Sequence, residues 1–418
     1  MQRPYTVVLI VPTGVGASIG GYAGDAMPVA RAIAQICDRL ITHPNVLNGA
    51  QLYWNLPNAL YVEGYGLDKF AAGCWGLQPV HQNRIGLILD QAIEPDLRLR
   101  HLQAAEATRA TLGLNLTDYV VTDAPLNVEL RTAASGASWG TIGNPGSLLR
   151  AADALIHQAR ADAIAVVARF PDDSGSDALQ AYRHGQGVDP LAGAEAVISH
   201  LIVRTFQVPC AHAPALMPLP LDPDLSPRSA AEEIGYTFLP CVLVGLSRAP
   251  QFVMKGMRTG DKGDIAGQGG GQNTSQPSPS STLSSQFPIA PNPQREPRVP
   301  HSPFPIATQN FTSLPGDIWA SQVDAVVIPA TACGGSALLS LSSQPQTQII
   351  AVEENQTSMQ VPPERLGIKA IRVNSYLEAL GVLVAHRAGI SAQALSPSLS
   401  SLSCLSVRGK TASRSTGN

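Results

Sequence analysis

Two glycine-rich turns carry the groups best suited to hold a negatively charged ligand. The first lies in VLIVPTGVGASIGGYAG, where an apolar strand runs into a turn and then into a helix. Glycine lets the backbone turn tightly and approach a ligand, and amides at the start of the following helix attract anions. We therefore expect a phosphate or carboxylate to be bound by Thr13, Gly14, Gly16, Ser18 and Gly20.

This first turn fits no nucleotide-binding motif closely. Its spacing is GxGxxxG rather than the GxGxxG of dinucleotide-binding folds, and no GK[ST] follows as in a phosphate-binding P-loop. The alternative is a turn that only packs its helix against the sheet. The sequence leaves both interpretations open.

The second turn, in AVVIPATACGGSA, offers a nucleophile as well as anion-binding amides. Gly334 and Gly335 would supply the amides, and Cys333 lies just ahead of a predicted helix. The positive end of a helix lowers the pKa of a thiol and favours the thiolate. The alternative is a cysteine that is inert in the core. A nucleophilic Cys333 would need a histidine base, and the candidates are His43, His81, His200 and His212.

Two carboxylates directly follow apolar strands, Asp123 in VVTDAP and Glu353 in IIAVEEN. A carboxylate at the carboxyl end of a parallel strand faces the crevice where ligands usually bind. There it can act as an acid or a base, or hold a divalent ion. We therefore expect catalytic roles for Asp123 and Glu353, with solubilising loop acids as the alternative. The same two interpretations apply to Asp172, Asp173, Glu232, Glu233 and Glu354.

Asparagines gather in the turn THPNVLNGAQLYWNLPN. Asn45 and Asn48 can each donate and accept hydrogen bonds, which suits recognition of a polyhydroxylated or carboxylated small molecule, and Asn55 and Asn58 extend the group. The same residues also build turns without any ligand.

Histidines lie in similar turns and are candidates for proton transfer, above all His81 in PVHQNR and His212 in PCAHAP. Cys210 and His212 form a CxH pair, which has no diagnostic spacing for a metal. No metal site is therefore predicted, and the need for a cofactor stays open.

Short apolar runs separated by helical patterns must position these groups. The runs lack the alternation of half-exposed strands, so they predict strands covered on both faces, as in a parallel sheet. They are Thr6–Val11, Ala59–Val62, Ile85–Leu89, Tyr119–Val121, Ala163–Ala168, Ala325–Ile328 and Ile349–Val352. Helices are predicted over Ser147–Ala161 and Ser375–Ala388, and the second is apolar on nearly all sides, which predicts a buried helix. The sequence therefore predicts a three-layer α/β fold with a mostly parallel sheet.

The chain divides into four predicted regions. Residues 1–256 form the main α/β region, and residues 317–390 form the C-terminal part of the same fold. Residues 257–316 are rich in glycine, serine, proline and glutamine, and they lack the apolar side chains that would offset the entropy of ordering. They are predicted to be a disordered insertion, and the serine-rich residues 391–418 a disordered tail. Lengthening a loop adds closure entropy slowly, so both sides of the insertion can share one sheet.

Composition restricts the classes of partner. The formal net charge of the 418 residues is −3 and only 14% are charged, so no broad basic field exists for nucleic acid or an anionic membrane. No apolar run approaches the roughly 18 residues that span a bilayer. The first apolar run stops at Pro12, too early for a signal peptide, and the six cysteines form no CxxC pair. We expect a soluble protein of a reducing, cytoplasmic compartment. Formation of a homo-oligomer stays open.

Several long strings resemble a known but uncharacterised family of cyanobacteria and plant plastids, described only as a domain of unknown function. They include VPTGVGASIGGYAGDAMPVARA, LITHPNVLNGAQLYWNLPNALYVEGYGLDKFA and SPRSAAEEIGYTFLPCVLVGLSRAPQ, and the similarity continues in PATACGG and LGVLVAHRAGI. The resemblance covers nearly all of the predicted folded part and departs from the family in the insertion and the tail. It implies a cytoplasmic or plastid-stromal setting, and it brings no catalytic residues with it.

The glycine turns, carboxylates and amides together predict a small-molecule enzyme. Its substrate would be an anionic metabolite, carboxylate or phosphate, and its chemistry acid/base catalysis such as isomerisation, racemisation or group transfer. Magnesium-dependent phosphoryl chemistry is also compatible with these groups. The alternatives are a noncatalytic metabolite-binding or sensor protein, and a scaffold without a pocket. The enzyme hypothesis requires that the two glycine turns face one hollow.

Overall fold

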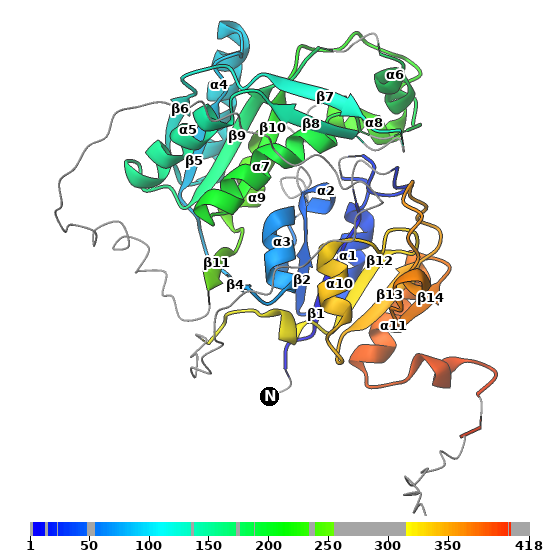
Figure 1. Cartoon of the computed structure of the whole chain (residues 1–418). Coiled ribbons are helices and arrows are strands. Elements are labelled where there is room, and N and C mark those ends of the chain that lie inside the picture. The colour runs from blue at the N-terminus through cyan, green and yellow to red at the C-terminus, as the bar shows by residue number, and fades with distance from the viewer. Residues whose placement is uncertain are drawn as a thin grey trace, which may run out of the picture.

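The computed structural model describes residues 3–12, 16–22, 24–47, 55–134, 138–172, 176–187, 189–233, 239–254, 315–399 and 401–402. The predicted insertion, apart from residues 315 and 316, and most of the predicted tail lie outside these described residues. In the described part of the tail, Ala392–Leu395 form a short 3-10 helix. Two parallel sheets form the cores of two lobes, which lie one above the other (Figure 1).

The first lobe is built on a six-stranded parallel sheet. Its strand order, β14-β13-β12-β1-β2-β3, is that of doubly wound nucleotide-binding folds. The predicted α/β class with a mostly parallel sheet is therefore confirmed. The strands are β1 (Thr6–Leu9), β2 (Arg39–Thr42), β3 (Ala59–Tyr61), β12 (Ala325–Pro329), β13 (Gln348–Val352) and β14 (Ala370–Val373).

Helices cover both faces of this sheet, which explains why its strands are apolar without alternation. On one face α1 packs against α11, and on the other α3 packs against α10. Successive residues of β1 serve the two faces: Val7 belongs to the core that contains α1 and α11, and Val8 to the core that contains α3 and α10. The helices are α1 (Met27–Ile36), α2 (Pro44–Leu47), α3 (Gly64–Ala71), α10 (Ser336–Ser342) and α11 (Tyr376–Arg387).

Residues before and after the predicted insertion contribute strands to this one sheet. β1 pairs in parallel with β12, with Val7 opposite Ala325 and Leu9 opposite Val327. The largely buried carboxylate of Asp324 accepts the amide of Thr6 at 2.7 Å, which supports this register. The centre of the first lobe thus depends on contacts between residues more than 300 positions apart.

The second lobe has a parallel sheet of order β10-β9-β5-β6. Helices α4 and α9 pack on one face, and α5 and α7 on the other, with the hairpin β7–β8 against α7. The elements are β5 (Ile85–Leu89), α4 (Pro95–Leu112), β6 (Leu116–Val121), β7 (Val128–Thr132), β8 (Ser138–Ile142), α5 (Pro145–His157), β9 (Ala163–Arg169), α6 (Asp177–Arg183), α7 (Ala192–Phe206), β10 (Cys210–Ala215), α8 (Pro227–Glu233) and α9 (Leu239–Ser247).

The predicted helices are present, with one difference in burial. The helix predicted from Ser147 is α5, and the helix predicted from Ser375 is α11, whose N-terminus Ser375 caps by accepting the Glu378 amide at 3.2 Å. The prediction that this last helix is buried on all sides is wrong. It packs on α1, β13, β14 and the 3-10 helix Ala392–Leu395, and Leu377 remains 80% exposed and Val384 54% exposed.

Two neighbouring chain crossings join the lobes. The chain enters the second lobe from β4 (Trp75–Gln78) and returns into β11 (Gln251–Met254), and these two strands pair in antiparallel. The buried side chain of Asn83 ties the crossings together. Its Nδ2 donates to the carbonyls of Leu246 and Ala249, both at 2.8 Å, and its Oδ1 accepts from Gln251 Nε2 at 2.9 Å.

The substitution Asn83→Ala should lower the free energy of unfolding by about 3 kcal/mol, because it removes a hydrogen bond from each of two buried carbonyls and from the Gln251 amide. Urea denaturation of both proteins measures the difference. The matched control is Gln82→Ala at the exposed neighbouring position, which should change stability by less than about 0.5 kcal/mol. Equal effects of the two substitutions would contradict the role given to Asn83.

Candidate functional site

The candidate site is the inter-lobe cleft, a hollow of about 350 Å³ between the two sheets. Loops that follow β1, β2 and β3 line it from the first lobe, and the N-terminal half of α7 with β10 lines it from the second. Carboxyl ends of parallel strands are the usual position for a ligand in such folds. The polar side chains that face one another there are His43, Asn45, Glu63, Asp189, Glu195, Ser199, His200 and His212.

A carboxylate–histidine pair joins the two lobes across this cleft. Glu63 lies two residues after the end of β3, and its Oε1 contacts Nδ1 of His200 on α7. Its Oε2 accepts the amide of Tyr65 at 2.8 Å, so the same carboxylate caps the N-terminus of α3. A Cβ at position 64 would come within 3.0 Å of His200 Cε1, so Gly64 leaves room for the imidazole.

The pair raises the pKa of His200. Burial by itself would lower this pKa, but the hydrogen bond and the negative charge of Glu63 outweigh burial and raise it above its ordinary value. The Glu63 side chain is only 1% exposed, whereas that of His200 is 44% exposed. His200 therefore lies at the cleft wall with a raised pKa, with Nδ1 held by Glu63 and Nε2 on the opposite side of its ring.

His43, at the end of β2, has the opposite electrostatic setting. Burial lowers its pKa to about 4, so the imidazole is neutral at physiological pH. Its Nε2 accepts the amide of Val11 at 2.9 Å, which assigns the ring proton to Nδ1. Asn45 Nδ2 donates to the carbonyl of the same Val11 at 2.7 Å. The end of β1 therefore fixes both side chains.

His212, in β10, is held by two residues one helical turn apart on α7. Its Nδ1 lies 3.2 Å from Ser199 Oγ, and its Nε2 lies 3.5 Å from Glu195 Oε2. The imidazole is 5% exposed and borders the cleft. Residues at i and i+4 of a helix share a face, which is why Glu195 and Ser199 reach the same ring.

The first glycine-rich turn borders the cleft without offering the anion cradle that we predicted. Thr13 and Gly14 lie outside the described residues. The amide of Ser18 donates to the Gln356 carbonyl at 2.8 Å, and the amide of Gly20 donates to the Asp25 carboxylate. The described amides at these positions are thus engaged within the protein, and the prediction that they face a ligand is wrong for Ser18 and Gly20.

The two glycine turns do follow neighbouring strands, but residues 355–361 fill the room between them. A Cβ at Gly16 would meet Ser358 Oγ at 2.6 Å, and one at Gly334 would meet Val361 Cγ1 at 3.2 Å. Thr331 and Thr357 are hydrogen-bonded at 2.8 Å between these points. Neither Gly334 nor Gly335 lines the cleft, so the prediction of one hollow shared by both turns is wrong for the described residues.

Three contacts join the glycine-rich turn to the second lobe. Tyr22 stacks on Tyr182 with ring centroids 4.5 Å apart, and Arg228 of α8 lies 3.7 Å from Asp25 while it donates to the Ser18 carbonyl. Burial raises the pKa of Asp25 to about 6 although Gly20 and Arg228 act against it. The lobes are thus held together at the glycine-rich turn as well as at the crossings.

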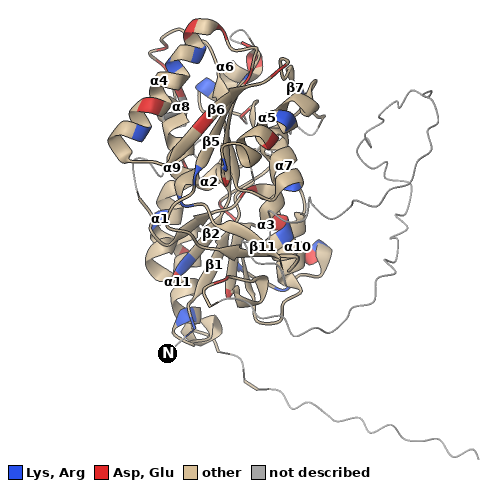
Figure 2. Cartoon of the chain, turned by 90° about the vertical axis from the view of Figure 1, so that its left-hand side faces the viewer, with Lys and Arg blue, Asp and Glu red and all other residues tan. Residues whose placement is uncertain are grey.

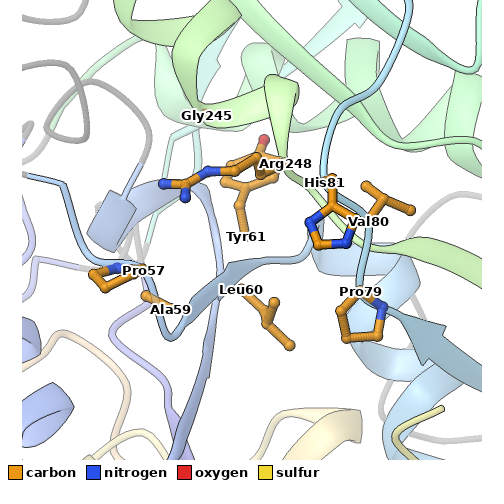
Figure 3. A pocket seen from close by; sticks show the side chains of 9 residues that line it. All are labelled: Pro57, Ala59, Leu60, Tyr61, Pro79, Val80, His81, Gly245 and Arg248. Atoms are coloured by element: carbon orange, nitrogen blue, oxygen red, sulfur yellow. The ribbon is translucent and has the colours of Figure 1, made fainter. Parts of the chain in front are cut away.

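The other predicted catalytic residues do not line the cleft. Asp123 is paired with Arg150 at 2.7 Å and Glu353 with Arg372, both near the surface. Cys333 is completely buried, and burial raises the pKa of its thiol to about 11, so the predicted low-pKa thiolate is wrong. His81 lines a separate pocket (Figure 3). Of the residues predicted to bind ligand, Asn45 lines the cleft and Asn48 lies outside the described residues.

Glu63, Glu195 and Ser199 were missed in the sequence. The signal for Glu63 was present, because it directly follows an apolar strand and precedes a glycine, as Asp123 and Glu353 follow theirs. The spacing of Glu195 and Ser199 on one helix face gives no such signal without knowledge of the strand beside it. Within the described residues, no group of three or more His, Cys, Asp or Glu is placed to hold a metal ion.

The substitution Glu63→Gln should lower the pKa of His200, because it removes the negative charge that outweighs burial. Titration of the ring nitrogens by NMR measures this change without any substrate. Glu195→Gln is the matched control, since it alters the partner of His212 in the same cleft and should leave the His200 titration in place. A His200 titration that is unchanged in Glu63→Gln would contradict the pairing.

Charged side chains are sparse and mixed over both lobes, as Figure 2 shows. None of the helices in the described part of the chain is both long and apolar enough to cross a membrane.

Comparison with known proteins places the chain among uncharacterised relatives. The model of a family described as a protein of unknown function, DUF3326, matches residues 6–269 and 298–396. An uncharacterised lipoprotein of a Synechococcus strain is 54% identical over 397 residues, which are 95% of each chain. No solved structure matches.

Proposed function

The chain belongs to the DUF3326 family of proteins of unknown function, and we propose that its inter-lobe cleft is the active site of a small-molecule enzyme. The reaction is a proton transfer on a small anionic metabolite, of the kind that occurs in isomerisation or racemisation next to a carboxylate. The proposal retains the acid/base chemistry expected from the sequence and assigns it to different residues.

One observation carries this proposal: two histidines in the same cleft have pKa values shifted in opposite directions. That of His200 is raised by Glu63, and that of His43 is lowered to about 4 by burial. Environments that separate the pKa values of neighbouring titratable groups are typical of acid/base pairs in enzymes. The cleft therefore holds one histidine whose pKa is raised and another that is neutral at physiological pH.

The geometry suggests a role for each histidine. His200, with Nδ1 held by Glu63, can bind the anionic group or give a proton from Nε2. Glu195 can take a proton from carbon and pass it to His212, whose Nε2 lies 3.5 Å away and whose Nδ1 contacts Ser199. Neutral His43 can donate from Nδ1 to the negative charge that develops on oxygen.

The charge of the cleft narrows the substrate class. The described lining contains no lysine or arginine, so positive charge for an anion comes from His200. Glu63, Asp189 and Glu195 add negative charge to the same wall. A single carboxylate is therefore better matched than a phosphate dianion, and the substrate is expected to be a small carboxylic acid with an acidic neighbouring C–H bond.

Proton exchange with solvent tests this proposal before the physiological product is known. The full chain is incubated in D₂O with a panel of small 2-hydroxy, 2-amino and 2-oxo acids, and loss of the C–H signal is followed by proton NMR. We expect exchange with at least one acid. His212→Gln and His200→Gln should each slow it by about 100-fold or more, because general acid/base groups contribute that much.

His157→Gln, at an exposed position of α5, is the control and should exchange like the unaltered protein. Exchange that survives both cleft substitutions would place the chemistry elsewhere. Binding of an acid, seen by saturation transfer, without any exchange would instead support the noncatalytic sensor.

We also propose that the protein works in the cytoplasm with its N-terminal strand in place. The Synechococcus relative is named a lipoprotein. In bacterial lipoproteins the acylated cysteine becomes the first residue after cleavage of the leader. Cleavage before Cys37 would remove β1, which lies between β12 and β2. The Cys37 side chain is buried at the end of α1, and burial raises its pKa to about 12.

Intact-mass spectrometry of the protein from its native cells tests this second proposal. We expect a mass that corresponds to a chain with residues 3–36 still present and without an acyl group. We also expect the protein in the soluble fraction. A mature chain that begins at acylated Cys37 would overturn it. Cys37→Ser controls for attachment at this residue and should leave the distribution between fractions unchanged.

A further inference from the structure

A second pocket lies on the side of the chain crossings, and nothing in the cleft accounts for it. This crossing-side pocket has a volume of about 450 Å³ and is formed by β3, by the connection from β4 to β5 and by the end of α9. Such a volume lies within the range of small-molecule sites. The pocket is therefore built from both lobes and from one of the two segments that join them.

Its chemistry differs from that of the cleft. Leu60, Val80 and two prolines give apolar walls, and Arg248 and His81 lie on either side of the opening in Figure 3. No acidic side chain belongs to the described lining. The third polar side chain, Tyr61, directs its hydroxyl to the Cys210 carbonyl at 3.2 Å, so Arg248 and His81 remain to meet a ligand.

Arg248 has more N–H donors than its hydrogen bond to Asn55 uses. One terminal nitrogen of its guanidinium donates to Asn55 Oδ1, and a guanidinium carries five N–H groups in a planar fork that matches a carboxylate. The exposed Arg248 side chain is held near the rim by this bond, and among the described residues it forms no salt bridge with an acidic side chain. The positive charge of Arg248 can therefore bind an anionic ligand.

We propose that the crossing-side pocket binds an amphipathic organic anion, a carboxylate on an apolar body. The carboxylate contacts Arg248 and His81, and the apolar body packs between Leu60, Val80 and the prolines. Because the ligand contacts β3 and α9 together, it holds the two lobes in one relative position.

This position couples the pocket to the cleft along two strands. Tyr61 is two residues from Glu63 in the chain, and Cys210, which accepts its hydroxyl, is two residues from His212. A ligand against Tyr61 therefore acts on the strands that carry a cleft residue from each lobe. The resulting control of the cleft rests on the function proposed above, whereas the binding itself does not.

Isothermal titration of the full chain with 4-phenylbutyrate tests the binding. We expect one site in the unaltered protein. Arg248→Gln should weaken binding by about tenfold or more, because it removes a charge-assisted hydrogen bond. Arg109→Gln, at an exposed position of α4, is the matched control and should bind normally. His200→Gln should also bind normally, which separates this pocket from the cleft.

Two further probes separate the charge from the apolar body. Acetate lacks the apolar body and 4-phenylbutanamide lacks the charge, so each should bind at least about tenfold more weakly than 4-phenylbutyrate. Equal binding of the amide, or normal binding by Arg248→Gln, would overturn the proposal. If Arg248→Gln shows no thermal unfolding transition and is therefore unfolded, His81→Gln is tested in its place. Weaker binding by His81→Gln is the expected result, and normal binding would overturn the proposal.

The coupling is read separately, as the rate of proton exchange with and without saturating 4-phenylbutyrate. A change in the unaltered protein that is absent in Arg248→Gln supports control from this pocket. An unchanged exchange rate would show that the crossing-side pocket does not regulate the cleft, and it would not affect the binding result. Absence of any exchange counts against the function proposed for the cleft, while the titration still decides whether the pocket binds anions.

Discussion

The buried carboxylate of Glu63 is the constraint on which the arrangement of the lobes depends. A charge with a side chain only 1% exposed costs several kcal/mol unless it is paired and hydrogen-bonded. The first lobe supplies amides at the start of α3, and the second supplies the imidazole of His200. Because the imidazole comes from the other lobe, separating the lobes would leave the carboxylate with only the two amides of α3. The stacked tyrosines and the hydrogen bonds of Asn83 at the chain crossings hold the two lobes in the same relative position as the Glu63–His200 pair does.

Much of the fold could be predicted from the sequence, because strands covered on both faces are apolar throughout. Runs such as Ile85–Leu89 and Ala325–Pro329 show this directly. β10 was missed because CAHAPA contains alanine and proline, which have little preference for strands, and β14 because it is a short edge strand that contains Arg372. The division into two sheets could not be predicted, since it depends on which strands pair over long distances and not on the strands themselves.

The candidate site was predicted by a correct rule applied to the wrong carboxylates. The rule that acids after parallel strands face a ligand holds for Glu63, whose strand ends opposite the other lobe. Asp123 and Glu353 also follow strands, but Arg150 and Arg372 lie within reach and form surface ion pairs with them. For Cys333 two effects compete: a helix of seven residues offers a weak field, and complete burial offers strong desolvation. Desolvation outweighs the helix field, so the pKa of the thiol is raised. The degree of burial depends on the packing of the whole lobe, which the local sequence does not show.

The position of the cleft follows from what fills the crevice between β1 and β12. In folds of this strand order the ligand usually lies there, where the strand order reverses. Here Asn355 is completely buried in it, exchanging hydrogen bonds of 2.9 Å with both backbone groups of Ile19 and donating to the Tyr376 hydroxyl at 2.8 Å. A ligand would have to displace three good hydrogen bonds to enter. Within the described residues, the ends of β2 and β3 line an open cleft, and the second lobe faces them with α7. The polar groups of this protein therefore converge beside the usual crevice rather than in it, where two lobes instead of one sheet enclose them.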